Sequence, residues 1–292
     1  MDAGKEIREF LTTRRAKITP SEAGLPTFGG YRRVPGLRRE EVALLAGVSV
    51  DYYTRLGRGN AAGVSTSVLA GIARALQLDE AERSHLFDLA NAAQPRPRQI
   101  RRKPQARIRP SVQRLLDSMT AAPALVRNNR FDILASNRIG HALYFEFGDG
   151  RSRSTNTARF LFLDPRSADF YVDLERSADD VVASLRSEAG RDPHDRNLID
   201  LIGELSTQSD AFRKRWAMHN VRFHDSGVKR LRHPVVGEMT LSYEAMPLAA
   251  DVGLTLFAYT AEAGSDSERA LERLGQWAVE VEAKQATEKA TA

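Results

Sequence analysis

Residues 94–110 read QPRPRQIRRKPQARIRP, and this run divides the chain into two parts. Seven of its 17 residues are basic and four are proline, whereas large apolar side chains are almost absent. Such a segment has too little apolar surface to join a core and is typical of an extended linker. We therefore expect two domains, at residues 1–93 and 111–292, joined by a linker at 94–110. The linker arginines either add contacts to a polyanion or only keep the tether solvated.

Charge is distributed unevenly along the chain. Residues 1–110 hold 20 Lys and Arg against 11 Asp and Glu, a net charge of +9. Residues 111–292 hold 23 Lys and Arg against 27 Asp and Glu, a net charge of −4. A basic first part followed by an acidic second part indicates that only the first part meets a polyanion such as nucleic acid.

Other sequence features limit the cellular compartment in which we expect the protein and the reactive groups that it can use. Cysteine is absent, which excludes disulfides, thiolate metal sites and a cysteine nucleophile. The first residues lack the basic-then-apolar order of a signal peptide, and the apolar runs are shorter than the roughly 18 residues that span a bilayer. We therefore expect a cytoplasmic, nucleoid-associated protein without a membrane partner.

The part before the linker has the apolar spacing of helices and no strand pattern. Five helices are expected, at residues 4–15, 37–46, 49–58, 67–76 and 79–91. Ser49 and Ser65 are suitable N-caps for two of them. Asp79 and Glu82 have the spacing of a capping box at the start of the fifth helix.

The part after the linker combines helical and strand patterns. Strands are expected at 125–126, 131–135, 221–223, 229–232, 237–246 and 253–260, with turns at Asn128-Asn129 and near Val236-Gly237. Helices are expected at 111–121, 137–145, 169–189, 198–206, 209–219 and 267–283. This order favours an α+β domain, an antiparallel sheet with helices packed on it. The predicted fold class is therefore mainly α, followed by α+β.

Residues 37–56 carry the strongest functional signal in the chain. Ala43 is small where two helices would cross closely, Gly47 lets the first helix end with a positive φ, and Ser49 caps the second helix. The residues expected to face the core are Val48, Tyr53 and Leu56. Two helices joined by a short glycine-containing turn form a helix-turn-helix, whose second helix enters the major groove of DNA.

Helical periodicity separates side chains that would read bases from those that would hold the DNA backbone. The candidates for base reading lie near the start of the second helix: Val50, Asp51, Thr54 and Arg55. Arg55 can bind guanine through two hydrogen bonds, and Val50 can touch a thymine methyl group. The candidates for phosphate contact are Arg32, Arg33, Arg38, Arg39, Ser49, Tyr52 and Arg58.

The stretch from Val34 to Leu56 resembles bacterial helix-turn-helix regulators of the Xre (Cro/CI-like) type, in particular those with an MmyB-like (MltR-type) ligand-binding domain. Matching motifs beyond the linker are LFLDP at 161–165, AGRDP at 189–193, GELS at 203–206, Trp216-Ala217 with His219, His233-Pro234 with Gly237-Glu238, and YTAE at 259–262 with Gly264-Ser265. The resemblance covers nearly the whole chain. It implies a five-helix DNA-binding domain, a PAS-like domain that senses a small, apolar, fatty-acid-like ligand, and a homodimer on double-stranded DNA.

Two positions depart from the pattern of this family. Gly57 stands where the family usually has Glu, which would pair with an arginine at the position of Arg14 or Arg15. The absence of this Glu should free that arginine. The glycine in its place should shorten the second helix, because glycine costs about 0.5–1 kcal/mol in a helix interior. Ser136 stands where Trp is common, so a cavity lined by this position would be larger or more polar.

A ligand cavity in the second domain would be mostly apolar with a few polar groups. The candidates for this pocket are Phe131, Asn137, Phe160, Arg215, Trp216, His219, Tyr243 and Phe257. Further candidate wall residues are Leu134, Leu143, Phe162 and Tyr259. For each apolar member, a place in the ordinary core is the favoured alternative, and a lone histidine such as His219 more often makes one structural hydrogen bond than contacts a ligand.

Two other classes of function are alternatives to a ligand-sensing regulator. An enzyme is not expected, because the HExxH zinc motif, the GxSxG nucleophile elbow and the phosphate-binding glycine-lysine loop are absent. No catalytic residue, metal or cofactor is therefore assigned. In the other alternative, the second domain takes no ligand and only dimerises the regulator or binds another protein. The apolar positions of residues 267–283 would then form a partner surface instead of core.

Overall fold

The computed structural model describes residues 2–26, 34–94, 108–145, 156–221 and 226–291, with side chains described to residue 283. The chain forms two compact units. The helical unit comprises residues 1–100 and 182–223, and the sheet unit comprises residues 101–181 and 224–292. In the part of the chain that is described, none of the helices has the length and apolar character needed to span a membrane.

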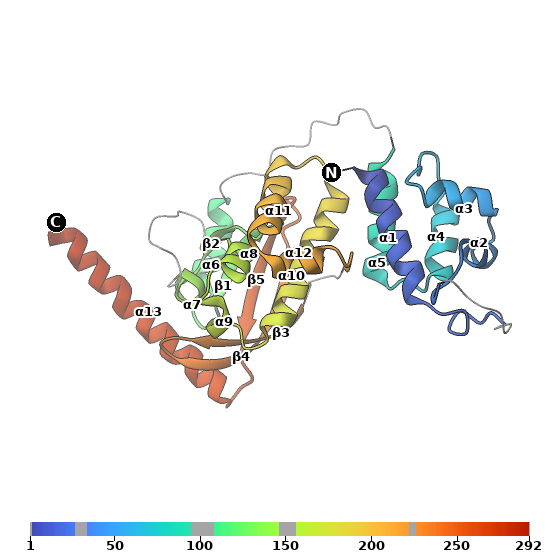
Figure 1. The fold of residues 1–292 in the computed structure, drawn as a ribbon. Helices are drawn as coiled ribbons and strands as arrows, with labels where there is room; N and C mark the ends of the chain where they lie inside the picture. The colour runs from blue at the N-terminus through green and yellow to red at the C-terminus, as the bar shows by residue number, and fades with distance from the viewer. Residues whose placement is uncertain (1, 27–33, 95–107, 146–155, 222–225, 292) are drawn as a thin grey trace. The chain divides into compact units, whose positions relative to one another are not determined.

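Five helices open the helical unit: α1 (Ala3–Lys17), α2 (Arg39–Ala46), α3 (Val50–Leu56), α4 (Thr66–Ala75) and α5 (Glu80–Ala92). They form one bundle (Figure 1), and all five predicted helices are confirmed. Apolar side chains from all five share a single core, to which Phe10, Val42, Tyr53, Ile72 and Leu86 contribute.

Local capping determines where three of these helices begin. The Ser49 hydroxyl accepts a hydrogen bond from the backbone N–H of Tyr52 at 3.1 Å, and Ser65 caps α4 in the same way. Asp79 and Glu82 form the predicted capping box of α5. Each cap satisfies backbone donors that a helix start leaves without partners, so the predicted starts of α3, α4 and α5 are confirmed.

The helical unit is completed by residues from the second half of the chain. They are the end of α10 (Leu174–Arg191) from residue 182, α11 (Arg196–Gln208) and α12 (Asp210–Trp216). The domain boundaries expected at the linker stay a prediction. Residues 182–223 belong to the same compact unit as the N-terminal helices, although they follow the linker in the sequence. Most of the predicted linker, residues 95–107, lies outside the described residues, as do residues 222–223 of the strand predicted at 221–223.

Five strands form the antiparallel sheet of the sheet unit: β1 (Ala124–Asn128), β2 (Ile133–Ser136), β3 (Ser226–His233), β4 (Gly237–Pro247) and β5 (Leu254–Thr260). Their order in the sheet is β2-β1-β5-β4-β3, and every neighbouring pair is antiparallel. Gly237, at the β3–β4 turn, has a φ of 84°, a conformation that glycine adopts without strain. The predicted fold class, a helix-turn-helix part followed by a PAS-like sheet-and-helix part, is confirmed.

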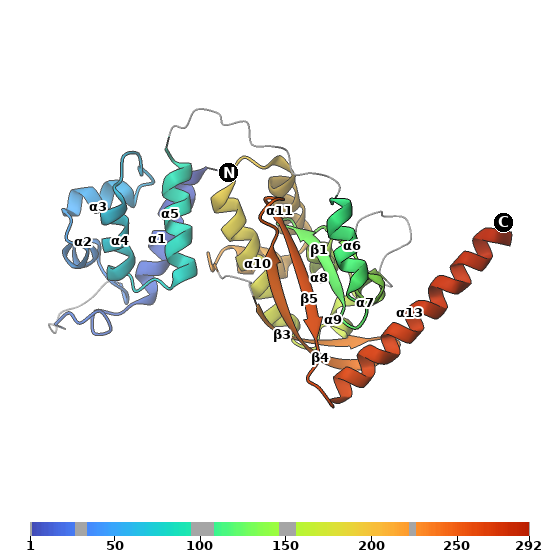
Figure 2. The ribbon, with the colours of Figure 1, turned by 180° about the vertical axis from the view of Figure 1, so that it is seen from behind.

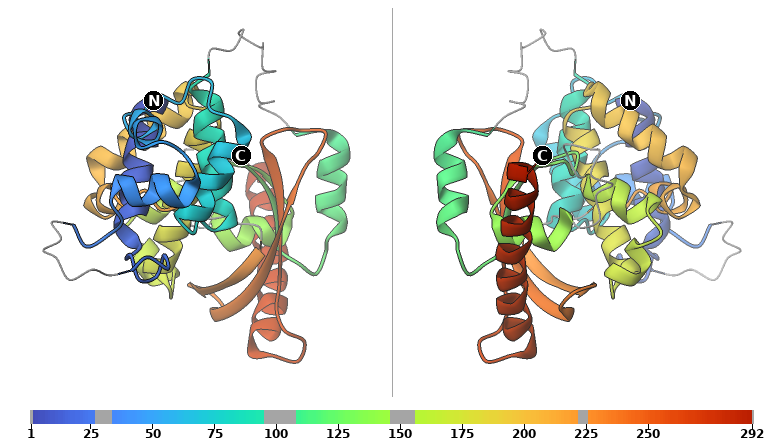
Figure 3. Two further views of the ribbon diagram at one scale, coloured as in Figure 1. Left: turned by 90° about the vertical axis from the view of Figure 1, so that its right-hand side faces the viewer. Right: turned by 90° about the vertical axis from the view of Figure 1, so that its left-hand side faces the viewer.

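Helices cover both faces of this sheet (Figures 2 and 3). On one face, Val112 and Leu116 of α6 (Pro110–Ser118) pack against Val126 and Leu256. On the other face, the core includes residues of α7 (Arg138–Phe145), α8 (Thr157–Leu163), α9 (Ser167–Phe170) and α13 (Asp266–Thr291). The last turns of α13 extend beyond the strands (Figure 1).

Two expectations about helices in this region are wrong. The single helix expected at 169–189 is two helices, α9 and α10, because Tyr171 leaves the helical path to form a β-bridge with Leu231. Helix α8 was not expected at all. Its sequence TARFLFL is too short and too uniformly apolar to show a helical period, although Asn156 caps it through the N–H groups of Ala158 and Arg159.

Two glycines inside helices offer a matched test of packing in the helical unit. A Cβ added at Gly71 in α4 would lie 2.7 Å from the carbonyl oxygen of Ala46 in α2, whereas one added at Gly203 in α11 would meet nothing within 4 Å. We predict that Gly71→Ala lowers the free energy of unfolding by about 1–3 kcal/mol, because α2 and α4 must separate. Gly203→Ala should raise it by about 0.5–1 kcal/mol. Urea unfolding measures both, and shifts of the same sign would contradict the close crossing of α2 and α4.

Candidate nucleic-acid interface and ligand-binding region

The turn between α2 and α3 has the geometry that the sequence predicted. Gly47 ends α2 with a φ of 70° and ψ of 34°, and the Val48 N–H donates to the Ala43 carbonyl at 3.0 Å. Ala43 is fully buried, and Ser49 caps α3 directly after the turn. The relative position of the two helices is therefore fixed by backbone hydrogen bonds and by the small residue at their crossing.

The candidates for base reading lie on the side of α3 away from the core. Tyr53 and Leu56 are buried, at 2% and 1% exposure, whereas Val50 is 42% exposed. Asp51 and Arg55 are exposed, and Thr54 is half-buried. The Arg55 guanidinium lies over the Tyr52 ring, 5.0 Å from its centroid, and makes no ion pair with any described residue. Its hydrogen-bond donors are thus available for a partner outside the chain.

The candidates for phosphate contact are placed in part. Arg38, Arg39 and Arg58 are exposed, Ser49 is exposed at the start of α3, and Tyr52 is half-buried. Arg32 and Arg33 lie outside the described residues. Arg38 and Arg39 stand at the N-terminus of α2, where the helix adds a partial positive charge. The exposed arginines at this end of α2 therefore suit an anion.

The expectation that Gly57 frees an arginine of α1 is wrong. Arg15 donates through Nη1 to the Leu37 carbonyl at 2.6 Å. Arg14 pairs with Glu82 at 3.1 Å and donates to the His219 carbonyl. Helix α3 does end at Leu56, with Gly57 at its C-cap. Both arginines therefore have partners, which come from positions far from Gly57 in the sequence.

A buried ionic network joins α1 to residues 182–223 within the helical unit. Arg186 is 1% exposed and donates to the Glu6 carboxylate at 2.6 Å and to His219 Nδ1 at 2.9 Å. It also donates to the Trp216 carbonyl, and its guanidinium lies 3.9 Å from the centroid of the Trp216 ring. Because Arg186 donates to Nδ1, the His219 proton is on Nε2, which lies 3.2 Å from the Glu9 carboxylate.

Two histidines beside this network are held neutral. Burial, followed by the charge of Arg186, lowers the pKa of His219 to about 4. Burial lowers the pKa of His85 to about 3, again helped by Arg186. Neither ring nitrogen of His85 has a hydrogen-bond partner among the described residues, and the ring packs against Phe10 and Gly190.

The eight candidates for the ligand pocket are divided between the two units. Arg215, Trp216 and His219 belong to the helical unit, where Trp216 and His219 serve the ionic network. The other candidates belong to the sheet unit, and its four aromatic members are buried in the core: Phe131, Phe160, Tyr243 and Phe257. The further wall candidates Leu143, Phe162 and Tyr259 also contribute to this core, while Leu134 packs on the opposite face.

Asn137 has a structural role that the sequence did not reveal. Its side-chain oxygen accepts from the N–H groups of Ala124 and Gly140, and its amide nitrogen donates to the carbonyls of Met119 and Ala122. All four hydrogen bonds are to the backbone. The side chain therefore fixes the approach of three chain segments and has little capacity left for a ligand.

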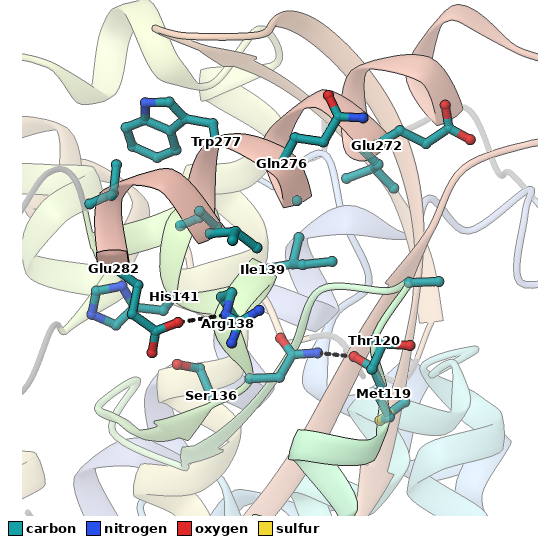
Figure 4. A pocket seen from close by; sticks show the side chains of 18 of the residues that line it. Met119, Thr120, Ser136, Arg138, Ile139, His141, Glu272, Gln276, Trp277 and Glu282 are labelled. Atoms are coloured by element: carbon teal, nitrogen blue, oxygen red, sulfur yellow. Dashed lines mark hydrogen bonds and ion pairs between the residues drawn. The ribbon is translucent and has the colours of Figure 1, made fainter. Parts of the chain in front are cut away.

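A hollow of about 910 Å³ opens in the sheet unit between the end of α6, the start of α7, and α13 (Figure 4). Its lining includes Ser136, Ile139 and Trp277, and an ion pair of 2.7 Å between Arg138 and Glu282 borders it. Ser136 is therefore one of the wall residues of this hollow. Among the described residues, no group of three or more His, Asp or Glu side chains is placed to hold a metal ion.

Comparison with known protein families identifies both parts of the chain. Residues 108–274 match the family model of the MmyB-like transcription regulator ligand binding domain. Residues 10–86 match that of a helix-turn-helix domain. No curated protein sequence matches the chain. The first match alone covers more than half of the 292 residues.

The neutral histidines predict how stability depends on pH. An unfolded chain protonates histidine near pH 6.5, well above the pKa values of about 3 and about 4 for folded His85 and His219. Below pH 6.5 the unfolded state therefore binds protons at these two histidines, whereas the folded state does not. The free energy of unfolding that they contribute is complete above pH 6.5 and decreases as the pH falls toward 4. We predict that His85→Leu makes the free energy of unfolding less dependent on pH between 7.5 and 4.5, without lowering it at pH 7.5.

Urea unfolding at the two pH values measures this effect. His194→Leu is the matched control, because His194 is exposed and should leave the pH dependence unchanged. A His85→Leu protein that loses as much stability on acidification as the wild type would contradict the neutral, buried state of His85.

Proposed function

Because the chain belongs to the MmyB-like transcription regulators, we propose that it is a ligand-responsive regulator that binds specific double-stranded DNA as a homodimer. The observation that carries this proposal is the exposed side of α3, held by the Gly47–Ser49 turn. Val50, Asp51 and Arg55 stand there clear of the core. A second helix presented in this way is the element that helix-turn-helix proteins insert into the major groove.

In the proposed complex, α3 reads bases while residues around it hold the DNA backbone. Arg55 binds a guanine through two hydrogen bonds, with its guanidinium already oriented over Tyr52. Val50, Asp51 and Thr54 contact neighbouring base edges. The backbone contacts come from Arg38, Arg39, Ser49, Tyr52 and Arg58, and from the sequence candidates Arg32 and Arg33. Two protomers bind half-sites about one helical turn apart, roughly 34 Å.

The sheet unit then acts as the sensor. A small ligand that binds one conformation better than another shifts their populations and so changes DNA affinity. The chain passes from the sheet unit into the helical unit within α10, which carries Arg186. We propose that the contact of Arg186 with Glu6 of α1 transmits this shift to the DNA-binding helices.

The alternative is a second domain that only dimerises the regulator or binds another protein. The exposed Val279 and the last turns of α13, which extend beyond the sheet, favour this reading. Mass spectrometry of organic extracts of the purified protein, together with light scattering, separates the two functions. A co-purifying small molecule whose addition changes DNA affinity supports sensing, whereas a dimer whose affinity no extract changes supports dimerisation alone.

Two arginine substitutions test the division between base reading and backbone contact. Arg55→Ala should weaken binding to the specific site by about 1–3 kcal/mol and relax sequence preference, because a base contact is lost. Arg39→Ala should weaken binding to all sequences alike and reduce the slope of log K against log salt by about one. Fluorescence anisotropy with specific and random duplexes measures both.

Arg213→Ala is the matched control for these variants. Arg213 is an exposed arginine of the helical unit that pairs with Asp210 at 2.5 Å, and its loss should leave DNA affinity unchanged. If Arg55→Ala and Arg39→Ala had the same effect on specific and random DNA, the assignment of the reading side of α3 would be wrong.

A further inference from the structure

Two oppositely charged side chains of α3 that could pair with each other do not. Asp51 and Arg55 are four residues apart in this helix, and both are exposed. Acidic and basic side chains at this spacing are neighbours on a helix surface and commonly form an ion pair. In α1, Lys5 and Glu9 form such a pair at 4.0 Å. By contrast, neither Asp51 nor Arg55 makes an ion pair with any residue in the described ranges.

The ring of Tyr52 holds Arg55 in place of that ion pair. The guanidinium carbon of Arg55 lies 5.0 Å from the centroid of the Tyr52 ring. Successive helix residues are about 100° apart around the axis, so Arg55 lies about 40° from Asp51 and about 60° from Tyr52. Both partners are therefore within reach of Arg55. An exposed contact between arginine and an aromatic ring contributes roughly twice as much as an exposed ion pair at this spacing, which favours the ring.

Tyr52 is itself held by the helical unit. Its backbone N–H donates to the Ser49 hydroxyl at 3.1 Å. Its half-buried ring packs against the core that the five N-terminal helices share. The ring is thus a fixed support for Arg55 without any contribution from DNA, and it keeps the guanidinium out of an ion pair with Asp51.

The two separated charges recognise different bases. Arg55 has only hydrogen-bond donors, which match the O6 and N7 acceptors of guanine in the major groove. Asp51, as a carboxylate, has only acceptors, which match the N4 amino group of cytosine. Each of the other three bases presents an acceptor in the major groove and would repel the carboxylate. An ion pair between Asp51 and Arg55 would satisfy both side chains and leave neither for a base.

We propose that Tyr52 is a positioning residue that keeps Asp51 and Arg55 apart, so that α3 reads a cytosine and a guanine in each half-site with separate side chains. Four residues of helix span about 6 Å, and base pairs are stacked about 3.4 Å apart. The two G·C pairs should therefore be no more than two base pairs apart. This inference rests on the proposed function and deepens it, because it names two bases of the half-site and the residue on which their recognition depends.

Selection of the full chain on random DNA duplexes, followed by sequencing, tests the inference by comparing variants with the wild type. The wild-type half-site should contain the two G·C pairs at this spacing. Tyr52→Leu should lose both base preferences together and bind the wild-type site roughly tenfold more weakly, because Arg55 then pairs with Asp51. Tyr52→Phe should keep both preferences, because the ring is retained.

A second substitution separates positioning from a merely structural role of Tyr52. In the Tyr52→Leu protein, Asp51→Ala removes the competing carboxylate and should restore the preference for guanine but not that for cytosine. Damage to the fold of α3 would not be repaired in this way. Asp51→Ala alone leaves the core contacts of Tyr52 intact and should lose only the preference for cytosine, so the test does not depend on the folding of Tyr52→Leu.

Phe87→Leu is the matched control. Arg83 lies over the Phe87 ring at 5.6 Å from its centroid, and this ring also packs against the core of the helical unit. Its loss should leave the selected motif unchanged.

Three results would overturn the positioning role and leave the regulator proposal standing. They are a wild-type motif without the two G·C pairs, a Tyr52→Leu protein that keeps both preferences, and a double variant that does not regain guanine. If the wild type selected no motif at all, the proposed function would fail along with this inference.

Discussion

The buried ion pair between Arg186 and Glu6 is the interaction on which the arrangement of the helical unit depends. It joins α1, at the start of the DNA-binding part, to a helix 180 residues later in the sequence. Breaking such a pair from one side leaves a buried charge, at a penalty of about 3–5 kcal/mol. Trp216, His219 and Arg14 extend the same contact. Residues after the linker are therefore part of the structure that supports the helix-turn-helix.

The two units enclose their arginines in different ways. In the helical unit, Arg186 has Glu6 and Arg14 has Glu82, so each guanidinium is compensated inside the chain. In the sheet unit, the Arg127 guanidinium lies over the rings of Phe131 and Phe257 and makes no ion pair with any of the described residues. The first pattern ties distant parts of the chain together by charge, whereas the second encloses a charge among aromatic rings.

Local rules were sufficient to predict the DNA-binding part from sequence. Gly47, Ser49 and the capping box at Asp79 each act within a few residues, so their effects can be read without a structure. Distant partners could not be read in this way. No sequence pattern links Arg14 to His219. Asn137 is expected from the sequence to contact a ligand, whereas its four hydrogen-bond partners in the structure are backbone groups.

The most direct test of sequence-specific DNA binding is selection of the full chain on a pool of random DNA duplexes, followed by sequencing of the bound fraction. A regulator with the exposed α3 side described above should enrich one motif of two related half-sites, with centres about 10 base pairs or one helical turn apart. A bound fraction as random as the starting pool, with affinity that depends only on salt, would reduce the N-terminal part to a basic surface and contradict the account.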